Sequence, residues 1–190
     1  NGCVDSVDIT LTEPDGYIVS ATISDVNGYS IGCNGSSNGT IDLSLFGGTG
    51  NYFYLWTPGG DTTSSLTGLG AGTYCAHITD DNNCPLDTCF TLTEPPVLGT
   101  TDSLSTYNGG NNISCFSLYD GYAGVTVTGG VPSYTVVWST GDTGLYINSI
   151  PAGTFSYTVT DSSGCMFTDS VTLTEPQPLN VAQDSLTSIL

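Results

Sequence analysis

The sequence predicts an all-β protein built of tandem immunoglobulin-like β-sandwich modules of about 81 residues, arranged as a rod. The first observation behind this prediction is an internal repeat, because Cys3, Cys84 and Cys165 are spaced by 81 residues. The second is that the short apolar runs between these landmarks alternate with a period of two, which indicates half-buried strands. No stretch has the periodicity of a helix. A tandem array of this kind favours a spacer or fibre over a single active site.

The repeat also sets the expected module boundaries. A Leu-Thr-Glu-Pro string closes each period. We therefore expect two whole modules, 15–95 and 96–176. Residues 1–14 align with the last strand of an upstream module, and residues 177–190 align with the start of the next module. The joints are short and contain proline, which restricts the angle between neighbours and favours a semi-rigid rod.

Within the first module, four segments carry the alternating pattern, namely 40–46, 51–56, 73–79 and 88–93. Trp56 lies on one of them, which we expect to be a central strand. With the intervening runs, the pattern indicates about seven strands per module, the number in an immunoglobulin-like sandwich. The equivalent inward positions expected in the second module are Val125, Val127, Tyr134, Val136, Trp138, Phe155, Tyr157, Val159, Val171 and Leu173.

The composition excludes several classes of function. The chain has no Lys or Arg, against 18 Asp and Glu, and its formal net charge is −18. Nothing can neutralise a phosphate, so we expect no nucleic-acid partner and no attraction to anionic lipid. No apolar run is long enough to span a membrane, so we expect no membrane insertion. The carboxylates have no internal cation partner, and we expect them to be solvated or neutralised by metal ions.

Seven cysteines in small β-rich modules indicate an oxidising, extracellular setting. One pair can be placed from its position in a hairpin. Cys75 and Cys89 are equidistant from a turn at 81–83, and both lie out of phase with the core positions. The second module has Ser156 and Ser170 instead, so both partners are present in one module and absent from the other. This predicts a cross-strand disulfide on the solvent face.

The remaining cysteines allow two arrangements. In the first, Cys33 pairs with Cys84 within one module. In the same way Cys115 pairs with Cys165 in the other module, which leaves Cys3 for a partner upstream. Closing a loop of about 50 residues would stabilise each module by about 4 kcal/mol in the chain-entropy model. A seven-stranded sandwich, however, puts the first inter-strand loop and the last hairpin turn at opposite ends. The alternative joins neighbouring modules, for example through Cys33 and Cys165. We prefer the pairing within modules and keep the alternative open.

Oxygen-rich clusters are candidate metal ligands. Asp25 with Asn27, and Asp80 with Asp81, offer the carboxylate and amide oxygens that calcium prefers. Only Asp80 recurs, as Asp161, and such clusters also form ordinary turns. Structural calcium is therefore one candidate, and no other cofactor is expected.

Catalysis is not expected from this sequence. Residues 35–39 fit the Gly-x-Ser-x-Gly pattern of hydrolases, but that pattern needs a strand–turn–helix elbow and a partner histidine. The segment is a polar loop, the second module lacks it, and His77 is the only histidine. His77 alternates with the core positions of its strand and should face solvent. We predict that the chain is not an enzyme.

A set of spaced residues recurs in both modules. In the first module the pattern consists of Cys33, Gly35, Gly47, Gly48, Tyr52, Trp56, Ala71, Gly72, Thr73, Tyr74, Thr79, Asp80, Cys84, Thr93, Glu94 and Pro95. The second module departs from it at two positions, with Ser117 in place of Gly35 and Phe155 in place of Tyr74. The pattern resembles the SprB-type repeat of very large cell-surface adhesins of Bacteroidota, the gliding-motility adhesin among them. It is also similar to polycystic-kidney-disease-type sandwiches, which supports the fold. The resemblance implies secretion by the type 9 system, surface display, and a role in adhesion or gliding motility.

The resemblance also bears on modification and partners. Ser6, Ser103, Ser170 and Ser185 each follow an aspartate in Asp-Ser-Val or Asp-Ser-Leu triplets, which resemble the O-glycosylation motif of Bacteroidota. The expected partners are neighbouring repeats of the same chain, including a homo-filament, and surface polysaccharide or other cells.

These observations predict a structural repeat segment of an extracellular bacterial adhesin or surface filament, with a spacer role. The alternative is a ligand- or carbohydrate-binding immunoglobulin-like module of a secreted protein, which would use exposed tyrosines such as Tyr107, Tyr119 and Tyr122. These tyrosines have no clear counterparts in the first module, which favours the scaffold.

Overall fold

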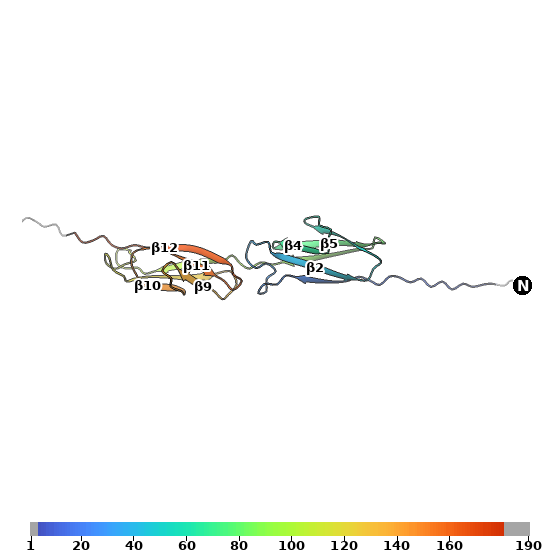
Figure 1. The fold of residues 1–190 in the computed structure, drawn as a ribbon, viewed down its shortest axis with the longest axis horizontal. Coiled ribbons are helices and arrows are strands. Elements are labelled where there is room, and N and C mark those ends of the chain that lie inside the picture. The colour runs from blue at the N-terminus through green and yellow to red at the C-terminus, as the bar shows by residue number, and fades with distance from the viewer. Residues whose placement is uncertain (1–3, 181–190) are drawn as a thin grey trace, which may run out of the picture. The chain divides into compact units, whose positions relative to one another are not determined.

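The computed structural model describes residues 4–180 and contains 12 β-strands in that range (Figure 1). Within residues 4–180 there is no helix, and therefore none long and apolar enough to cross a membrane. The chain divides into two compact units, unit 1 up to Glu94 and unit 2 from Pro95. The prediction of an all-β protein is confirmed.

Unit 1 is made of six strands: β1 (Ile18–Ile23), β2 (Gly39–Phe46), β3 (Tyr52–Thr57), β4 (Ser65–Leu69), β5 (Gly72–Asp80) and β6 (Pro85–Leu92). They form two three-stranded antiparallel sheets, one in the order β1-β2-β4 and the other in the order β3-β5-β6. Each sheet therefore has one fully paired strand, β2 or β5, between two edge strands.

Unit 2 repeats this arrangement with β7 (Gly99–Leu104), β8 (Gly121–Thr128), β9 (Thr135–Trp138), β10 (Tyr146–Ile150), β11 (Gly153–Thr160) and β12 (Met166–Leu173). The two antiparallel sheets are β7-β8-β10 and β9-β11-β12. Each strand of unit 2 thus has a counterpart in unit 1 at the same place in its sheet.

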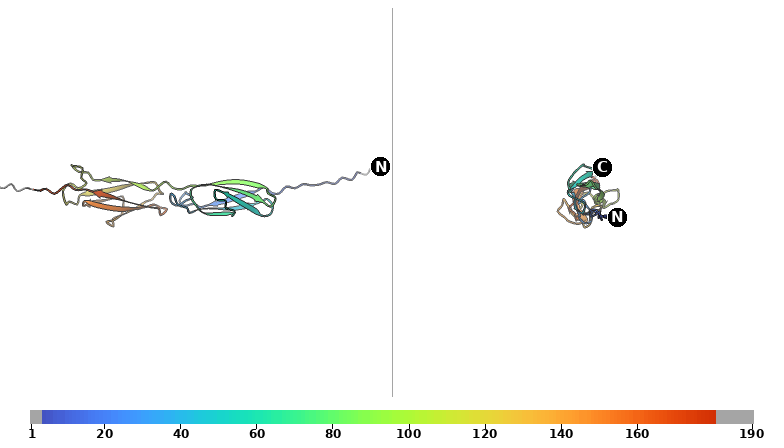
Figure 2. Two further views of the ribbon diagram at one scale, coloured as in Figure 1. Left: turned by 90° about the horizontal axis from the view of Figure 1, so that it is seen from above. Right: turned by 90° about the vertical axis from the view of Figure 1, so that its right-hand side faces the viewer.

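In each unit the two sheets face each other and bury one apolar core between them (Figures 1 and 2). In unit 1, Ile41 of β2 and Ile78 of β5 are both fully buried, so both sheets contribute. Inward residues alternate with exposed ones along the strands, as where buried Trp56 follows exposed Leu55 on β3. This is the β-sandwich that the alternating pattern predicts.

Two details of the sandwich differ from the expectation. Each unit has six strands instead of about seven. The tryptophans lie on the edge strands β3 and β9, not on central strands. Residues 24–38 form turns and bends, because their backbone groups bond to other parts of the chain: the Ile31 N–H, for example, donates to the Thr93 carbonyl at 2.9 Å.

The segments outside the sandwiches form no strands within residues 4–180, and their assignment to neighbouring modules stays a prediction. Residues 4–14, predicted as the last strand of an upstream module, form no strand, and Val7, Ile9 and Leu11 are largely exposed. A strand needs a neighbour for its hydrogen bonds, and none of the described strands pairs with this segment. Residues 177–180, assigned to the start of a further module, form no strand either. Residues 1–3 and 181–190 lie outside the described range.

Candidate functional site

The polar residues that recur between the units gather at the two ends of each sandwich. We call the end where the first strand begins the entry end, and the end where the last strand finishes the exit end. In unit 1 these are the ends at Ile18 of β1 and at Leu92 of β6. The Tyr17 hydroxyl donates to the Cys84 carbonyl at 2.8 Å, so the start of β6 lies at the entry end. The eight residues of β6 then separate the two ends by about 26 Å.

A buried carboxylate organises the entry end of unit 1. Asp80, at the end of β5, is only 1% exposed. Its Oδ1 accepts the backbone N–H groups of Asn82 at 2.9 Å and Cys84 at 3.0 Å, and its Oδ2 accepts that of Thr49 at 2.9 Å. One side chain therefore fixes the β5–β6 turn, which carries Cys84, to the loop between β2 and β3.

Unit 2 holds its entry end in the same way. Asp161 accepts the N–H groups of Ser163 and Cys165 at 2.9 Å each, and that of Val131 at 2.8 Å. Gly130 has a φ of 59°, and a Cβ at this position would lie 2.8 Å from the Asp161 Oδ2. In unit 2 the second glycine of the Gly-Gly pair is therefore required by the close approach of the carboxylate. At Gly48 of unit 1, a Cβ would lie 2.7 Å from the Tyr17 ring and 3.2 Å from the Asp80 Oδ2.

The hydrogen bonds at the entry end act on the charge of Asp80. The N–H of Cys84 is the largest influence that holds the pKa of the Asp80 carboxyl below its ordinary value, with Thr49 and Asn82 adding to it. Burial opposes this shift, but it is outweighed. Asp80 is therefore ionised at neutral pH and acts as a fixed acceptor of backbone hydrogen bonds.

A glutamate organises the exit end, a role that was not predicted from the sequence. Glu94 accepts the Asn34 Nδ2 at 3.1 Å and the Gly35 N–H at 2.7 Å. In unit 2, Glu175 accepts the Ser117 N–H at 2.7 Å. The glutamate of the Thr-Glu-Pro string thus holds the loop that begins at Cys33 or Cys115. Its recurrence in both modules is the signal that could have pointed to this role.

The predicted calcium ligands do not form one cluster. Asp25, in the turn after β1, accepts the Gly28 N–H at 2.8 Å. Asp80 ends β5 and Asp81 follows it, at the opposite end of the sandwich, so the structure does not bring Asp25 and Asn27 to them. Within the described residues, no three His, Cys, Asp or Glu side chains form a group that could hold a metal ion. Structural calcium stays a prediction.

The segment from Tyr29 to Asp61 contains the Cys33 loop, β2, the Gly-Gly turn and the Trp56 strand. This segment, residues 29–61, matches the family model described as the SprB repeat. The chain contains a SprB-type repeat. SprB repeats occur in cell-surface proteins of the adhesin type. A search of the curated proteins found no match to the chain.

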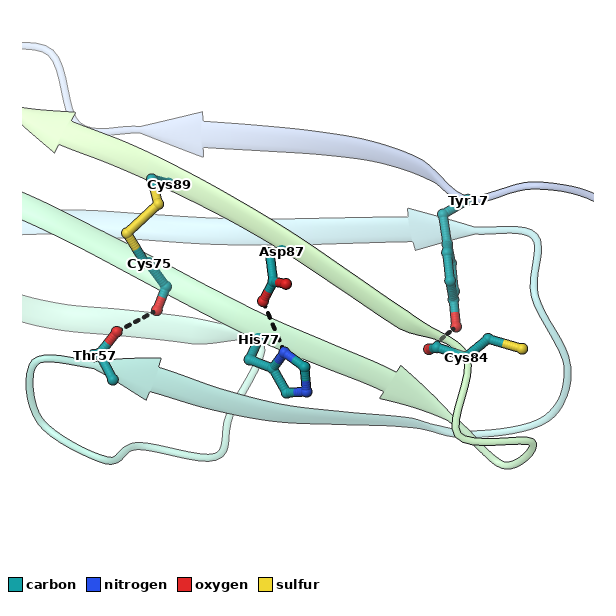
Figure 3. A network of polar contacts seen from close by, with 7 residues as sticks. All are labelled: Tyr17, Thr57, Cys75, His77, Cys84, Asp87 and Cys89. Atoms are coloured by element: carbon teal, nitrogen blue, oxygen red, sulfur yellow. Dashed lines mark hydrogen bonds and ion pairs between the residues drawn. A yellow bond between two sulfur atoms is a disulfide. The ribbon is translucent and has the colours of Figure 1, made fainter.

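The SprB-type unit 1 contains a disulfide on its solvent face. Cys75 and Cys89 pair directly across β5 and β6, with their Cα atoms 4.0 Å apart and a bond between their sulfurs (Figure 3). Two residues further along β5, His77 lies on the same outer face, half exposed, with its Nδ1 2.7 Å from the Asp87 Oδ1. The predicted exposure of His77 is confirmed. In unit 2 the position of the disulfide is taken by the pair Ser156 and Ser170.

The preferred pairing of the other cysteines is absent from the structure. Cys84 and Cys115 carry free thiols, so neither Cys33–Cys84 nor Cys115–Cys165 is formed. The reason is distance: Cys33 belongs to the exit end and Cys84 to the entry end, about 26 Å away along β6. A disulfide needs Cα atoms within about 7 Å. Cys33 and Cys165 are nevertheless each disulfide-bonded. The alternative pairing between modules stays a prediction, and Cys3 lies outside the described residues.

The hydrolase-like segment of the SprB-type repeat does not form a nucleophile elbow. Residues 35–39 run through a loop into β2, and no helix follows them. His77 lies in the middle of β5 and contacts Asp87. The arrangement that hydrolases need, a serine on a strand–turn–helix elbow beside a histidine, is not built by these residues.

The tyrosines of the alternative prediction have different surroundings. The Tyr107 hydroxyl donates to the Asp120 carbonyl at 2.9 Å and so holds a loop, while Tyr119 is 68% exposed. Tyr122 stacks on Tyr146, with ring centroids 6.0 Å apart and planes 26° apart. Both rings of this pair are exposed. Tyr146 was not predicted from the sequence, because only the pairing of β8 with β10 brings it beside Tyr122.

The predicted glycosylation sites are accessible where the structure describes them. Ser6, Ser103 and Ser170 are exposed. Ser185 lies outside the described residues. O-glycosylation of these serines stays a prediction.

Proposed function

We propose that this chain is a structural repeat segment of an extracellular bacterial adhesin or surface filament, in which its role is that of a spacer. The observation that carries the proposal is which residues recur. The recurring side chains hold the sandwich together: buried Trp56 and Trp138, the buried Asp80 and Asp161, and the loop-holding glutamates at the exit ends.

Several exposed side chains, in contrast, do not recur, although the exposed Thr73–Thr91 pair does, as Thr154–Thr172. The solvent face of the β5–β6 hairpin has the Cys75–Cys89 disulfide, whereas the same place in unit 2 has two serines. The Tyr122–Tyr146 pair belongs to unit 2, and the residue that aligns with Tyr146 in unit 1 is Ser65. A repeated binding activity would need the same exposed residues in each copy. Recurrence of the scaffold without the disulfide and the tyrosine pair fits a spacer.

The chemistry of the surface suits a protein outside the cell. The chain has no Lys or Arg, so proteases that cut after basic residues have no site in it, folded or unfolded. Its net charge of −18 makes neighbouring copies repel each other and keeps them soluble. The Cys75–Cys89 disulfide persists only under oxidising conditions. Secretion by the type 9 system and a part in adhesion or gliding belong to this proposal.

The proposal is tested by antibody labelling of cells that make the protein. An antibody raised against this chain should label intact cells, with the label on surface filaments in electron micrographs. Cells lacking the gene are the control for specificity. Label that appears only after the cells are permeabilised would contradict an extracellular location, and label confined to isolated globules would contradict a filament.

One observation favours a second candidate, binding of carbohydrate by unit 2. The exposed faces of stacked tyrosines are the apolar surface on which sugar rings pack, and Tyr122 and Tyr146 provide two such rings side by side. If this candidate holds, Tyr122→Ala with Tyr146→Ala should abolish binding of the chain to surface polysaccharide. Tyr119→Ala removes a more exposed ring outside the pair and is the control. Equal binding by all three proteins would exclude the pair as a sugar site.

A further inference from the structure

Each unit has one cysteine at either end. In unit 1, Cys84 is at the entry end, where its carbonyl accepts the Tyr17 hydroxyl (Figure 3). Cys33 is at the exit end, in the loop that Glu94 holds through the Gly35 N–H. The spacing repeats in unit 2, where Cys165 directly precedes β12 and Cys115 begins the loop held by Glu175.

Two of the four cysteines are disulfide-bonded and two are free thiols. Each of these pairs contains one entry-end and one exit-end cysteine. Cys33 at an exit end and Cys165 at an entry end are disulfide-bonded. Their equivalents Cys115 and Cys84 are exposed free thiols. The free thiols are thus one exit-end and one entry-end cysteine, at positions that form disulfides in the other unit. Both thiols are exposed and therefore accessible to a second thiol.

The free thiol at the exit end of unit 2 lines a pocket. Cys115 and Phe116 form one side of it and Pro176, Gln177, Pro178 and Leu179 the other, around a volume of about 500 Å³. The surface is apolar and uncovered, with Phe116 48% and Leu179 98% exposed. At the entry end, Cys84 is followed by Pro85, a second exposed apolar residue. A pocket of this kind gains from being covered by an apolar partner.

We propose that the exit end of unit 2 binds the entry end of a second copy of this chain, and that Cys115 of one copy forms a disulfide with Cys84 of the other. The contact joins two different surfaces of the chain, so it is head-to-tail and repeats from copy to copy. The bond also holds the copies against the repulsion between their acidic surfaces.

The bond forms by thiol–disulfide exchange with a small disulfide such as oxidised glutathione. The Cys84 thiolate attacks one glutathione sulfur, which gives a mixed disulfide and releases one glutathione thiolate. The Cys115 thiolate of the second copy then attacks the Cys84 sulfur and releases the other glutathione thiolate. Two protein thiols are oxidised to one disulfide, one glutathione disulfide is reduced to two glutathione molecules, and the protons of the two protein thiols pass to solvent or to the released thiolates.

The test uses the full chain with Cys3→Ser, because Cys3 aligns with Cys84 in the repeat. In a glutathione redox buffer, this protein should give a ladder of oligomers on a non-reducing gel. Adding Cys84→Ser or Cys115→Ser should leave each variant, when it is alone, with only slow dimerisation through its one remaining free thiol. A mixture of the two variants should give dimers and nothing larger, at a rate about tenfold higher than either alone, a modest gain in effective concentration from docking.

A matched variant separates docking from simple thiol reactivity. Phe116→Ser removes the apolar wall of the pocket, and since Phe116 is exposed the unit should remain folded, which circular dichroism checks. The mixture should then lose its tenfold advantage. Peptide mapping with a protease that cuts after acidic residues, because there is no Lys or Arg, should find Cys84 linked to Cys115.

The opposite results would overturn the proposal. If each single variant dimerises alone as fast as the mixture, the thiols are merely reactive. If the protein accumulates as monomer with glutathione on Cys84 or Cys115, there is no docking. These measurements need no cells, so their outcome and the outcome of surface labelling can be told apart.

Discussion

The two units fill equivalent positions of their cores with aromatic side chains from different strands. In unit 1, Trp56 packs on Phe90 of β6, with ring centroids 6.2 Å apart. In unit 2, Trp138 packs on Tyr157 of β11 at 4.9 Å. Tyr157 aligns with Ala76 of unit 1. The aromatic partner has therefore moved from one strand to its neighbour, while the tryptophan has kept its place.

The hydrogen-bond partners of this ring are also found only in unit 2. The buried Tyr157 hydroxyl donates to the Asp102 Oδ1 at 2.7 Å and lies 2.7 Å from the Thr100 Oγ1, both on β7. At the equivalent positions of β1, unit 1 has Val19 and Ala21, which suit an apolar core. This sandwich therefore tolerates a rearranged core if the total volume of the core side chains is conserved and each buried polar atom has a hydrogen-bond partner.

Replacing either tryptophan should destabilise its own unit by the same amount, because the tryptophan is the part of the core that the two units share. Trp56 and Trp138 are buried, and their Nε1 atoms donate to the carbonyls of Thr63 and Gly144, each at 2.9 Å. We expect Trp56→Ala or Trp138→Ala to lower the free energy of unfolding of its own unit by about 4 kcal/mol. Urea denaturation followed by the fluorescence of the remaining tryptophan and by circular dichroism measures both units.

Two further variants make this test sharp. Leu55→Ala changes an exposed neighbour of Trp56 and should cost less than about 0.5 kcal/mol. If an alanine variant does not fold, Trp56→Phe gives a smaller and measurable loss. A loss in one unit only would mean that the two cores depend on their tryptophans differently.

The disulfide is the largest difference on the surface, and it should stabilise unit 1 alone. Cys75 and Cys89 are 14 residues apart, and a loop of this length is worth about 3 kcal/mol in the chain-entropy model. Replacing both with serine should lower the free energy of unfolding of unit 1 by about that amount. Trp56 fluorescence in a Trp138→Phe background reports on unit 1, because the chain has two tryptophans.

The reciprocal variant is the control. Ser156→Cys with Ser170→Cys places two cysteines directly opposite each other on β11 and β12. Under oxidising conditions unit 2 should become more stable, and under reducing conditions the gain should vanish. No change in unit 1 on losing its disulfide would show that the bond is dispensable there.

Much of the fold follows from residue alternation, but not all of it. Strands such as β2 and β5 have an apolar residue at every second position, so the pattern predicts them. β1 was not predicted, although Val19, Ala21 and Ile23 alternate with polar outward residues, because exposed Ile18 obscures the alternation where the strand begins. β4 was not predicted because its buried side chains are few: Leu66 is the one that is fully buried. The edge position of Trp56 depends on which strands pair, and alternation does not contain that information.

The cysteines show the same limit. A hairpin fixes its own register, so the Cys75–Cys89 pair could be predicted from its distance to the turn. The placement of Cys33 depends on the path of residues 24–38, which follow hydrogen bonds to Thr93 and Glu94 and have no periodic pattern. Recurrence marked Glu94 as a landmark, but only the structure identifies it as the residue that holds the Cys33 loop.

The Tyr157 hydroxyl should matter in unit 2 and has no equivalent in unit 1. Burial, with the hydrogen bond to Asp102, raises the pKa of Tyr157 from 10.0 to about 12. We expect Tyr157→Phe to lower the free energy of unfolding of unit 2 by about 1.5 kcal/mol, the value of a hydrogen bond to a charged group. Trp138 fluorescence in a Trp56→Phe background measures it.

The same hydroxyl gives unit 2 an alkaline dependence. The folded pKa lies above the unfolded value, so the stabilisation is fully present below pH 10.0 and is lost as the pH rises through about 12. Tyrosine ionisation is followed by ultraviolet absorbance, with free thiols blocked. The parent should contain one tyrosine, ionising near pH 12, that is missing from the titration of Tyr157→Phe. An identical titration of both proteins would contradict the assignment to Tyr157.

The effect that we expect to be smallest comes from acid, and it acts on a feature that both units share. Because hydrogen bonds, that from the Cys84 N–H first, hold the pKa of folded Asp80 below 3.8, the folded state binds the proton less tightly than the unfolded state. The stabilisation is therefore present above pH 3.8 and is lost as the pH falls through the lower folded pKa.

Asp80→Asn should make unit 1 less stable at neutral pH but flatten its loss of stability in acid, as measured by urea denaturation with Trp56 as the probe. Asp42→Asn, at an exposed position of β2, should leave the acid limb unchanged. Equal acid limbs in the parent and in Asp80→Asn would mean that other carboxylates control the acid unfolding of unit 1.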